Sequence, residues 1–228
     1  MQTRKKKQDI KRLTTAAVFC ALAFGISALC NVVPITLVPS LPFLHYDAKD
    51  VLIAICGLIL GPVYALGVSL VSALLELAIS STGLIGMLMN FLSSAVFSCS
   101  CALVYKAVKS IKGAFMGLAA STVLTTAFML GWNYLITPLY MGISREAVAA
   151  LLIPAFLPFN LIKCGINAGI CLLIYKPVVN ALRKAKVIPS GSDKKATLKS
   201  GLPAILVGIC AISACVATAL YLNGVSIF

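Results

Sequence analysis

The chain has 228 residues, of which 61% are hydrophobic and 11% are charged, and its formal net charge is +13. A soluble domain carries roughly 25% charged residues, so this composition leaves too few polar side chains to cover a surface that faces water. It excludes a large soluble domain and an extracellular receptor module, and it predicts an all-α integral membrane protein. With about 20 apolar residues for each span, a chain of this length allows about six to eight spans.

Along the chain, a basic tail over residues 1–12 precedes the first apolar run, residues 13–33. Residues 34–50 form a Pro-rich loop that is unusually apolar for an exposed segment. The next run, residues 51–79, is almost continuously apolar and is broken only by the Gly-Pro pair at positions 61–62. The remaining apolar runs are separated by short polar breaks and cover residues 84–105, 113–137, 152–175 and 202–222.

Residues 51–79 form either one long tilted span or two short helices with a turn at the Gly-Pro pair. The positions of the positive charges decide between these two arrangements, because Lys and Arg gather on the cytoplasmic side of membrane proteins. If residues 51–79 form two helices, 16 of the 19 basic residues lie on the side of the N-terminus. If they form one helix, the basic loops 106–112 and 176–200 lie on the other side. We therefore expect two helices, a cytoplasmic N-terminus and an outer C-terminus in the cell membrane, with Lys49 and Arg145 outside. This placement explains the net charge without binding to nucleic acid.

Lys163 is the clearest polar candidate inside a predicted span, in the run FLPFNLIKCGINA. An ammonium group in hydrocarbon costs at least ~2.5–3.5 kcal/mol. Asn160 lies three residues before it and Asn167 four residues after it, so all three share one face of a helix. They belong either to a binding site or to a structural arrangement in which Lys163 snorkels to the headgroups and the asparagines bridge helices.

Two further polar residues are predicted near the outer surface: Asn133, beside Trp132, and Glu76, near the end of a short helix. The tryptophan is typical of an interfacial aromatic belt, and Glu76 by itself fits a carboxylate that reaches water or pairs with a lysine. Together with Asn160 and Lys163, these groups lie within about two helical turns of the same surface. Four such groups at one depth indicate a pocket that opens to the outside.

The apolar loop 34–50, with Phe43 and Leu44, is expected to lie above this pocket as a lid. Asp47 and Asp50 in the same loop are expected to be solvated and to cap the helix that follows. Amides, one cation and aromatic rings suit a flat, heteroaromatic molecule that forms hydrogen bonds. The sequence shows neither metal-ligand spacing nor a catalytic constellation, so we expect a protein with no metal site and no enzymatic activity of its own.

The first apolar run carries small residues at every fourth position, Ala17, Ala21 and Gly25. A face of this kind lets another helix approach closely. From the spacing alone, packing within the same bundle is the simpler interpretation, and contact with a separate partner protein is the alternative.

The segments FLHYDAKD, WNYLITPLYMG and LPFNLIKCGINA resemble the riboflavin-specific substrate-binding subunit of energy-coupling factor (ECF) transporters. The resemblance covers residues 10–187, and its most specific parts are WNYLITPLYMG and PFNLIK. It implies a six-helix membrane subunit that captures a vitamin from outside the cell. It also implies that this subunit works in the lipid bilayer with a transmembrane coupling protein and two cytoplasmic ATPases, and that riboflavin is the transported ligand rather than a cofactor.

By this resemblance, the flavin is held by the amides of Asn133 and Asn160 and by Lys163, under the loop 34–50. The small-residue face of the first helix contacts the coupling protein. The residues expected at the coupling contact are Ala17, Ala21 and Gly25. The full set of expected ligand contacts is Asn133, Asn160, Lys163, Glu76, Asn167, Trp132, Phe43 and Leu44.

The C-terminal segment departs from the family, because it adds a linker and a further apolar run. The expected organisation is a basic cytoplasmic tail (1–12), a six-helix substrate-binding domain (13–187), a basic linker (188–200) and an extra hydrophobic helix (201–228). Two alternatives remain open for the function. The same fold would serve another vitamin or heterocycle, or the chain would be a proton-coupled secondary transporter with Glu76 as the carrier, although it lacks the internal repeats typical of that class.

Overall fold

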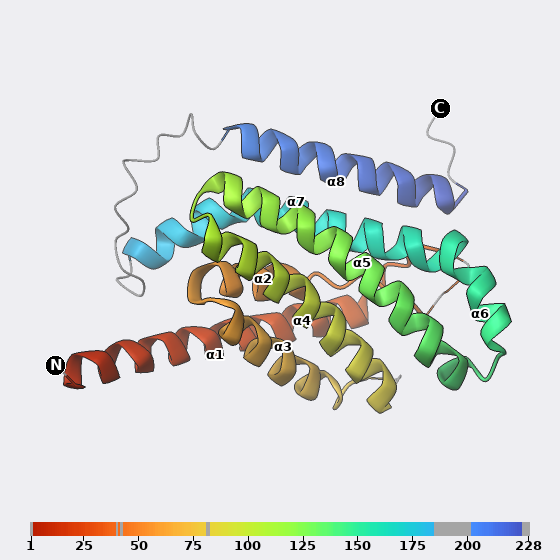
Figure 1. The fold of residues 1–228 in the computed structure, drawn as a ribbon, viewed down its shortest axis with the longest axis horizontal. Coiled ribbons are helices and arrows are strands. Elements are labelled where there is room, and N and C mark those ends of the chain that lie inside the picture. The colour runs from red at the N-terminus through yellow and green to blue at the C-terminus, as the bar shows by residue number, and fades with distance from the viewer. Residues whose placement is uncertain (1, 40, 42, 81–82, 185–201, 225–228) are drawn as a thin grey trace.

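A computed structural model describes residues 2–39, 41, 43–80, 83–184 and 202–224 (Figure 1). These residues form a bundle of helices and contain no β-strand. The helical elements are, in chain order, α1 (Gln2–Val32), α2 (Lys49–Leu60), α3 (Pro62–Glu76), α4 (Gly83–Ala107), α5 (Ile111–Met141), α6 (Arg145–Leu151), the π-helical turn η1 (Leu152–Phe156), α7 (Leu157–Lys184) and α8 (Leu202–Leu222).

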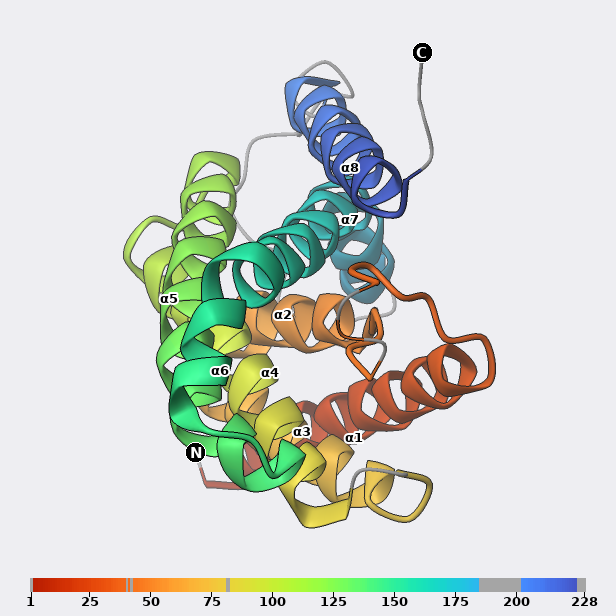
Figure 2. The same ribbon diagram turned by 90° about the vertical axis from the view of Figure 1, so that its right-hand side faces the viewer.

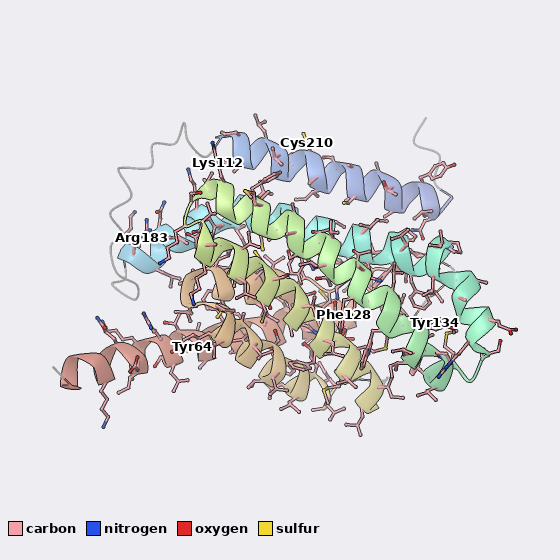
Figure 3. All side chains as sticks on the ribbon, in the orientation of Figure 1. Tyr64, Lys112, Phe128, Tyr134, Arg183 and Cys210 are labelled. Carbon is pink, nitrogen blue, oxygen red and sulfur yellow. The ribbon has the colours of Figure 1, made fainter. Side chains whose placement is uncertain are left out.

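Five helical stretches in the described part of the chain are long and apolar enough to cross a membrane. They lie in α1, α4, α5, the continuous α6–η1–α7 segment and α8. The prediction of an all-α membrane fold with an extra C-terminal helix is therefore confirmed. Lys112 and Arg183 lie at the same end of the bundle as the start of α1 (Figure 3), as the distribution of positive charge predicts.

The segment from Lys49 to Glu76 folds as two short helices, α2 and α3, with a sharp turn at Gly61 between them. Their 12 and 15 residues correspond to lengths of only about 18 and 22 Å, which is less than a bilayer core of about 30 Å. The side chains of Lys49 and Glu76, at the two ends of the hairpin, form an ion pair. The two-helix interpretation is confirmed, and both ends of the hairpin lie on one side of the bundle.

The helix α2 lies at the centre of the bundle, where it packs against α1, α3, α4 and α7 (Figure 2). Ile53, Ala54, Ile55 and Cys56, which together cover all sides of the helix, are fully buried. A helix that is apolar on every side is typical of the interior of a bundle. Because α2 is enclosed, the residues at its N-terminus are also placed inside the protein.

Two helices differ in extent from the sequence prediction. The basic tail continues α1 as helix from Gln2 onward, because the segment contains neither Pro nor Gly and is rich in Lys, Arg and Gln, which favour helices. The helix expected from the apolar run 152–175 does not start there, because it follows α6 without a break. Pro154 lies within the π-helical turn η1, where the wider backbone accommodates a residue that cannot donate a hydrogen bond.

The last helix, α8, lies along α7 on the outside of the bundle (Figure 1). Close contact is possible because glycines face each other: a Cβ atom at Gly208 would lie 2.9 Å from the carbonyl oxygen of Gly169. Much of the opposite side of α8 is exposed and apolar, including Leu206 and Val216, as expected for contact with lipid. The predicted linker, residues 188–200, lies outside the described residues.

The turn between α2 and α3 generates a prediction. Gly61 has φ 103° and ψ 170°, a region that is essentially restricted to glycine, so Gly61→Ala should destabilise the protein by about 1–3 kcal/mol. Gly67→Ala is the matched control, because Gly67 is helical and an added Cβ would meet open space. It should leave stability unchanged or raise it by about 0.5–1 kcal/mol. Thermal unfolding in detergent measures both; equal effects of the two changes would contradict the role of Gly61.

Candidate ligand-binding site

A cavity of about 290 Å³ lies at the end of the bundle where the α2–α3 hairpin has its two ends. Its size is close to the lower limit of small-molecule pockets, roughly 300–1,000 Å³. It is lined by the ends of α1 and α3, the loop before α2, and parts of α4, α5 and α7: Cys30, Asn31, Phe43, Leu44, His45, Tyr46, Asp47, Glu76, Ser80, Gly86, Met87, Met89, Asn90, Ser93, Met129, Asn133, Thr137, Tyr140, Phe159, Asn160 and Lys163.

Lys49 is the first member of a buried charge network beside this cavity. Its side chain is only 1% exposed and contacts two carboxylates: that of Asp47, at 3.0 Å, and that of Glu76. The sequence places Lys49 among the outer basic residues but does not predict that its side chain is buried. The side chain is buried because α2 begins inside the bundle, so its first residue must find counter-charges there.

Lys163 and Asp50 form the second pair of the network. The Nζ atom of Lys163 lies 3.3 Å from a carboxylate oxygen of Asp50, and the other Asp50 oxygen accepts a hydrogen bond from the hydroxyl of Ser94. Asp50 is only 2% exposed, so its expected role as a solvated loop charge is wrong. Lys163 is also buried, and it is held by Asp50 rather than extended to the lipid headgroups.

Asp47 connects the loop to the network. Its carboxylate accepts hydrogen bonds from the Ser27 hydroxyl of α1, at 3.0 Å, and from the backbone N–H of Lys49, at 2.9 Å. The N-cap of α2 is Ala48, which makes no side-chain capping bond, so Asp47 is not the N-cap but bonds the first N–H of the helix from the preceding position. Burial alone would raise the pKa of the Asp47 carboxyl, but the nearby ammonium groups of Lys49 and Lys163 outweigh burial and hold this pKa below its ordinary value.

The network contains three carboxylates and two ammonium groups. When all five are ionised, the carboxylates of Asp47, Asp50 and Glu76 exceed the ammonium groups of Lys49 and Lys163 by one negative charge. The oxygen Oε1 of Glu76 is buried and has no hydrogen-bond partner in the described part of the chain. Because Glu76 also lines the cavity, this oxygen is available to accept a hydrogen bond from a ligand.

Asn133 and Asn160 are held in place by their own helices. The Nδ2 atom of Asn133 donates to the carbonyl of Met129, at 2.7 Å, and its Oδ1 atom accepts from the Thr137 hydroxyl, at 3.1 Å. The Nδ2 atom of Asn160 donates to the carbonyl of Phe156, at 2.8 Å. These local bonds fix the amides, and both side chains are buried residues that line the cavity.

Asn167 lies outside the cavity lining, unlike Asn160 and Lys163 on the same face of α7. Its Oδ1 atom accepts a hydrogen bond of 2.7 Å from the Tyr46 hydroxyl, and its Nδ2 atom donates to the Asp47 carbonyl, at 3.3 Å. Burial raises the pKa of Tyr46, so the phenol remains protonated and keeps donating at neutral pH. Asn167 is not among the cavity-lining residues; it fastens the end of the loop to α7.

The aromatic residues separate into two groups. Phe43, from the loop, contacts Tyr140 of α5 with ring centroids 5.6 Å apart, and both rings line the cavity together with Leu44. Trp132 instead stacks on Phe128, with centroids 6.1 Å apart, and it is not among the lining residues. Phe128 and Tyr134 lie on the exposed side of α5 (Figure 3).

Asn133, Asn160, Lys163 and Glu76 are thus brought to one cavity, whereas the sequence analysis missed the roles of Lys49 and Asp50. The sequence did contain an indication of these roles. Lys49 and Asp50 are opposite charges at the N-terminus of an apolar helix that is too short to span the membrane, so its charged end has little access to water. Sequence analysis could not tell which residues would neutralise them. The described residues contain no group of three or more His, Cys, Asp or Glu that could hold a metal ion.

The small-residue face of α1 is open. Ala17, Ala21 and Gly25 are exposed, while Ala16 and Ala23 on the other side of the helix are buried in the core. The simpler interpretation from spacing, packing of this face within the same bundle, is therefore wrong for the described structure. The face remains available for another helix.

Comparison with known proteins decides the family. A family model described as "ECF transporter, substrate-specific component" matches residues 11–175, which is most of the chain. The chain belongs to this family. The match ends within α7, so α8 lies beyond the residues that the family model covers.

Named relatives of the chain are transporters. It is 31% identical to "Riboflavin transporter RibU" of Staphylococcus aureus over 81% of this chain and 100% of the relative. It is 29% identical to "Riboflavin transporter FmnP" of Bacillus subtilis over 78% of this chain and 98% of the relative. A solved structure of the S component of a bacterial ECF transporter aligns with a TM-score of 0.65 at 29% identity, covering 77% of this chain and 99% of that one.

The Asp50–Lys163 pair generates a prediction. Asp50→Asn keeps the shape of the side chain but leaves the Lys163 ammonium without its counter-charge, and it should destabilise the protein by about 3–5 kcal/mol. Adding Lys163→Met to the same chain should restore part of this loss, because the uncompensated charge is removed. The control Glu146→Gln, at an exposed acidic residue of α6, should change the free energy of unfolding by less than about 0.5 kcal/mol.

Chemical or thermal unfolding in detergent measures these variants. A loss for Asp50→Asn no larger than that of the control, or a double variant that is less stable than Asp50→Asn alone, would contradict the assignment of this pair.

Proposed function

We propose that this chain captures riboflavin from outside the cell and delivers it for ATP-driven uptake with a separate energy-coupling module. The observation that carries the proposal is the cavity in which two fixed amides, a buried lysine and a free carboxylate oxygen converge beside a loop with aromatic residues. The family match supports the transport role, and the names of the relatives support the choice of riboflavin.

The chemistry of the cavity suits the chemistry of a flavin. The flavin ring is flat and apolar over most of its surface, and one edge carries two carbonyl oxygens and an N–H group. A buried lysine and asparagine amides provide donors and acceptors for such an edge, while Phe43, Leu44 and Tyr140 provide apolar surface for the ring. The ribityl chain carries hydroxyl groups, for which the free oxygen of Glu76 is a suitable acceptor.

The proposed ligand contacts are accordingly Asn133, Asn160, Lys163, Glu76, Phe43 and Leu44. Asn167 acts indirectly, because it fastens Tyr46 and the loop to α7. Trp132 is left without a ligand contact in this proposal, since it stacks on Phe128 away from the lining. A role for Glu76 as a proton carrier gains no support from its position, because Glu76 is already paired with Lys49 beside the cavity.

The coupling role is assigned to the exposed face of α1. We propose that Ala17, Ala21 and Gly25 contact the transmembrane coupling protein, which in turn works with two ATPase subunits. Small side chains allow the helix backbones to approach closely without a polar cost. In this arrangement the chain lies in the cell membrane with the N-terminus in the cytoplasm and the cavity outside, and the chain itself catalyses no reaction.

Riboflavin binding tests the substrate. The purified protein is titrated with riboflavin, and the quenching of flavin fluorescence is followed. Asn160→Ala should weaken binding by about 5- to 100-fold, because a buried polar group of the ligand loses its partner. The control Trp132→Phe should change the affinity by less than about twofold, since Trp132 does not line the cavity. An affinity for Asn160→Ala equal to that of the wild type would contradict the site, and no riboflavin binding by the wild type would overturn the substrate.

Uptake tests the coupling face. Ala17→Trp and Ala21→Trp should leave riboflavin binding unchanged but reduce ATP-dependent uptake strongly, because a bulky side chain keeps the partner helix away. Ala127→Trp on the exposed side of α5 is the matched control and should leave both binding and uptake intact. Normal uptake by both α1 variants would refute the assigned coupling face, and uptake without any ATPase partner would refute the coupled mechanism.

A further inference from the structure

The packing of α8 on α7 is close along much of its length. A Cβ atom at Gly169 would lie 2.6 Å from Ile212 and 2.9 Å from the carbonyl oxygen of Gly208, and one at Gly165 would lie 2.5 Å from the Sγ atom of Cys215. These distances are shorter than ordinary contacts of a Cβ atom, so α7 carries glycine at the points where α8 approaches it. The helix α8 therefore fits a specific surface of α7 rather than resting loosely beside it.

The C-terminal end of α8 reaches the loop that covers the cavity. The Nδ2 atom of Asn223 donates a hydrogen bond to the carbonyl oxygen of Leu37, at 3.3 Å. One turn earlier, Ala219 is buried in the same apolar cluster as Leu37, Val38 and Leu41. A residue near the end of the chain thus contacts a loop that lies 186 positions earlier in the sequence.

The loop has two halves that are joined by backbone hydrogen bonds. Leu37, Val38 and Leu41 belong to the cluster shared with α8, while residues 43–47 line the cavity. The amide of Leu44 donates to the carbonyl of Leu41, at 2.9 Å, and the amide of Tyr46 donates to the carbonyl of Ile35, at 2.8 Å. A displacement of the half that contacts α8 is therefore transmitted to the half that covers the cavity.

We propose that α8 is a built-in strap that holds the loop 34–47 over the cavity and thereby slows the exchange of the bound molecule. The helix is anchored on α7 by the glycine contacts, and its far end holds the loop through Asn223 and Ala219. The identity of the exchanging molecule rests on the proposed riboflavin function, but the restraint on the loop does not. The family model ends before α8, so the strap is an addition to the family's common core.

Two pairs of full-length variants test the strap. Asn223→Ala removes the hydrogen bond to the loop and also the bond that the same Nδ2 atom donates to the Ala219 carbonyl within α8. Thr218→Ala is its control, because it removes a comparable bond within α8, from the Thr218 hydroxyl to the carbonyl of Ala214. Gly208→Leu forces α8 away from α7, and its control Ala214→Leu adds bulk at an exposed position of α8. The second pair tests the position of the helix, whereas the first pair tests a single contact.

Two measurements are made on each variant. Hydrogen–deuterium exchange of the amides in segment 34–47, without ligand, reports the freedom of the loop independently of any substrate. The dissociation rate of riboflavin, followed by stopped-flow fluorescence, reports the consequence for the ligand. Asn223→Ala should increase both rates by about two- to tenfold, as expected for the loss of the one hydrogen bond between α8 and the loop, and Gly208→Leu should increase them further. Both controls should match the wild type.

Loop exchange equal to that of the controls in Asn223→Ala would overturn the strap, and this outcome remains decisive if Gly208→Leu fails to fold. Faster loop exchange with an unchanged dissociation rate would overturn the claim that the strap controls ligand exchange. If the wild type binds no riboflavin, the proposed substrate fails, while the exchange of the loop amides still decides whether α8 restrains the loop.

Discussion

The buried charge network at the start of α2 is the constraint on which the rest of the site depends. Lys49 and Asp50 begin a helix that is otherwise apolar and enclosed, and an unpaired charge there would be strongly destabilising. Lys49 requires the carboxylates of Asp47 and Glu76, and Asp50 requires Lys163. The loop, the end of α3 and the N-terminal part of α7 must therefore meet at one place, and the cavity lies beside that place.

The short length of α2 and α3 determines where this network lies. A helix of full span would carry its end residues to the membrane surface, where water would solvate their charges. The turn at Gly61 instead allows two half-length helices to bring both of their charged ends into the bundle from the same side. Buried ion pairs of this kind add little stability compared with apolar side chains of the same size, so their main effect here is to fix the position of Lys163 and Glu76 around the cavity.

The loop over the cavity is held by two different helices. Asn167 of α7 binds its C-terminal end through Tyr46 and Asp47, and this helix belongs to the core matched by the family. Asn223, at the end of α8, binds the N-terminal half of the loop, and α8 lies beyond the family match. The chain therefore combines a family fold with an added helix that contacts the loop from the outside.

The sequence by itself determined the membrane class, the order of the helices and the hairpin at Gly61, because hydropathy, glycine geometry and the distribution of Lys and Arg are local properties. It also placed Asn160 and Lys163 on one helix face, since the helical repeat alone sets that relation. Only the tertiary structure decided which charges are paired: Lys49 and Glu76 are 27 residues apart. Their pairing depends on which helices pack together, and the periodicity of a single helix carries no information about its neighbours.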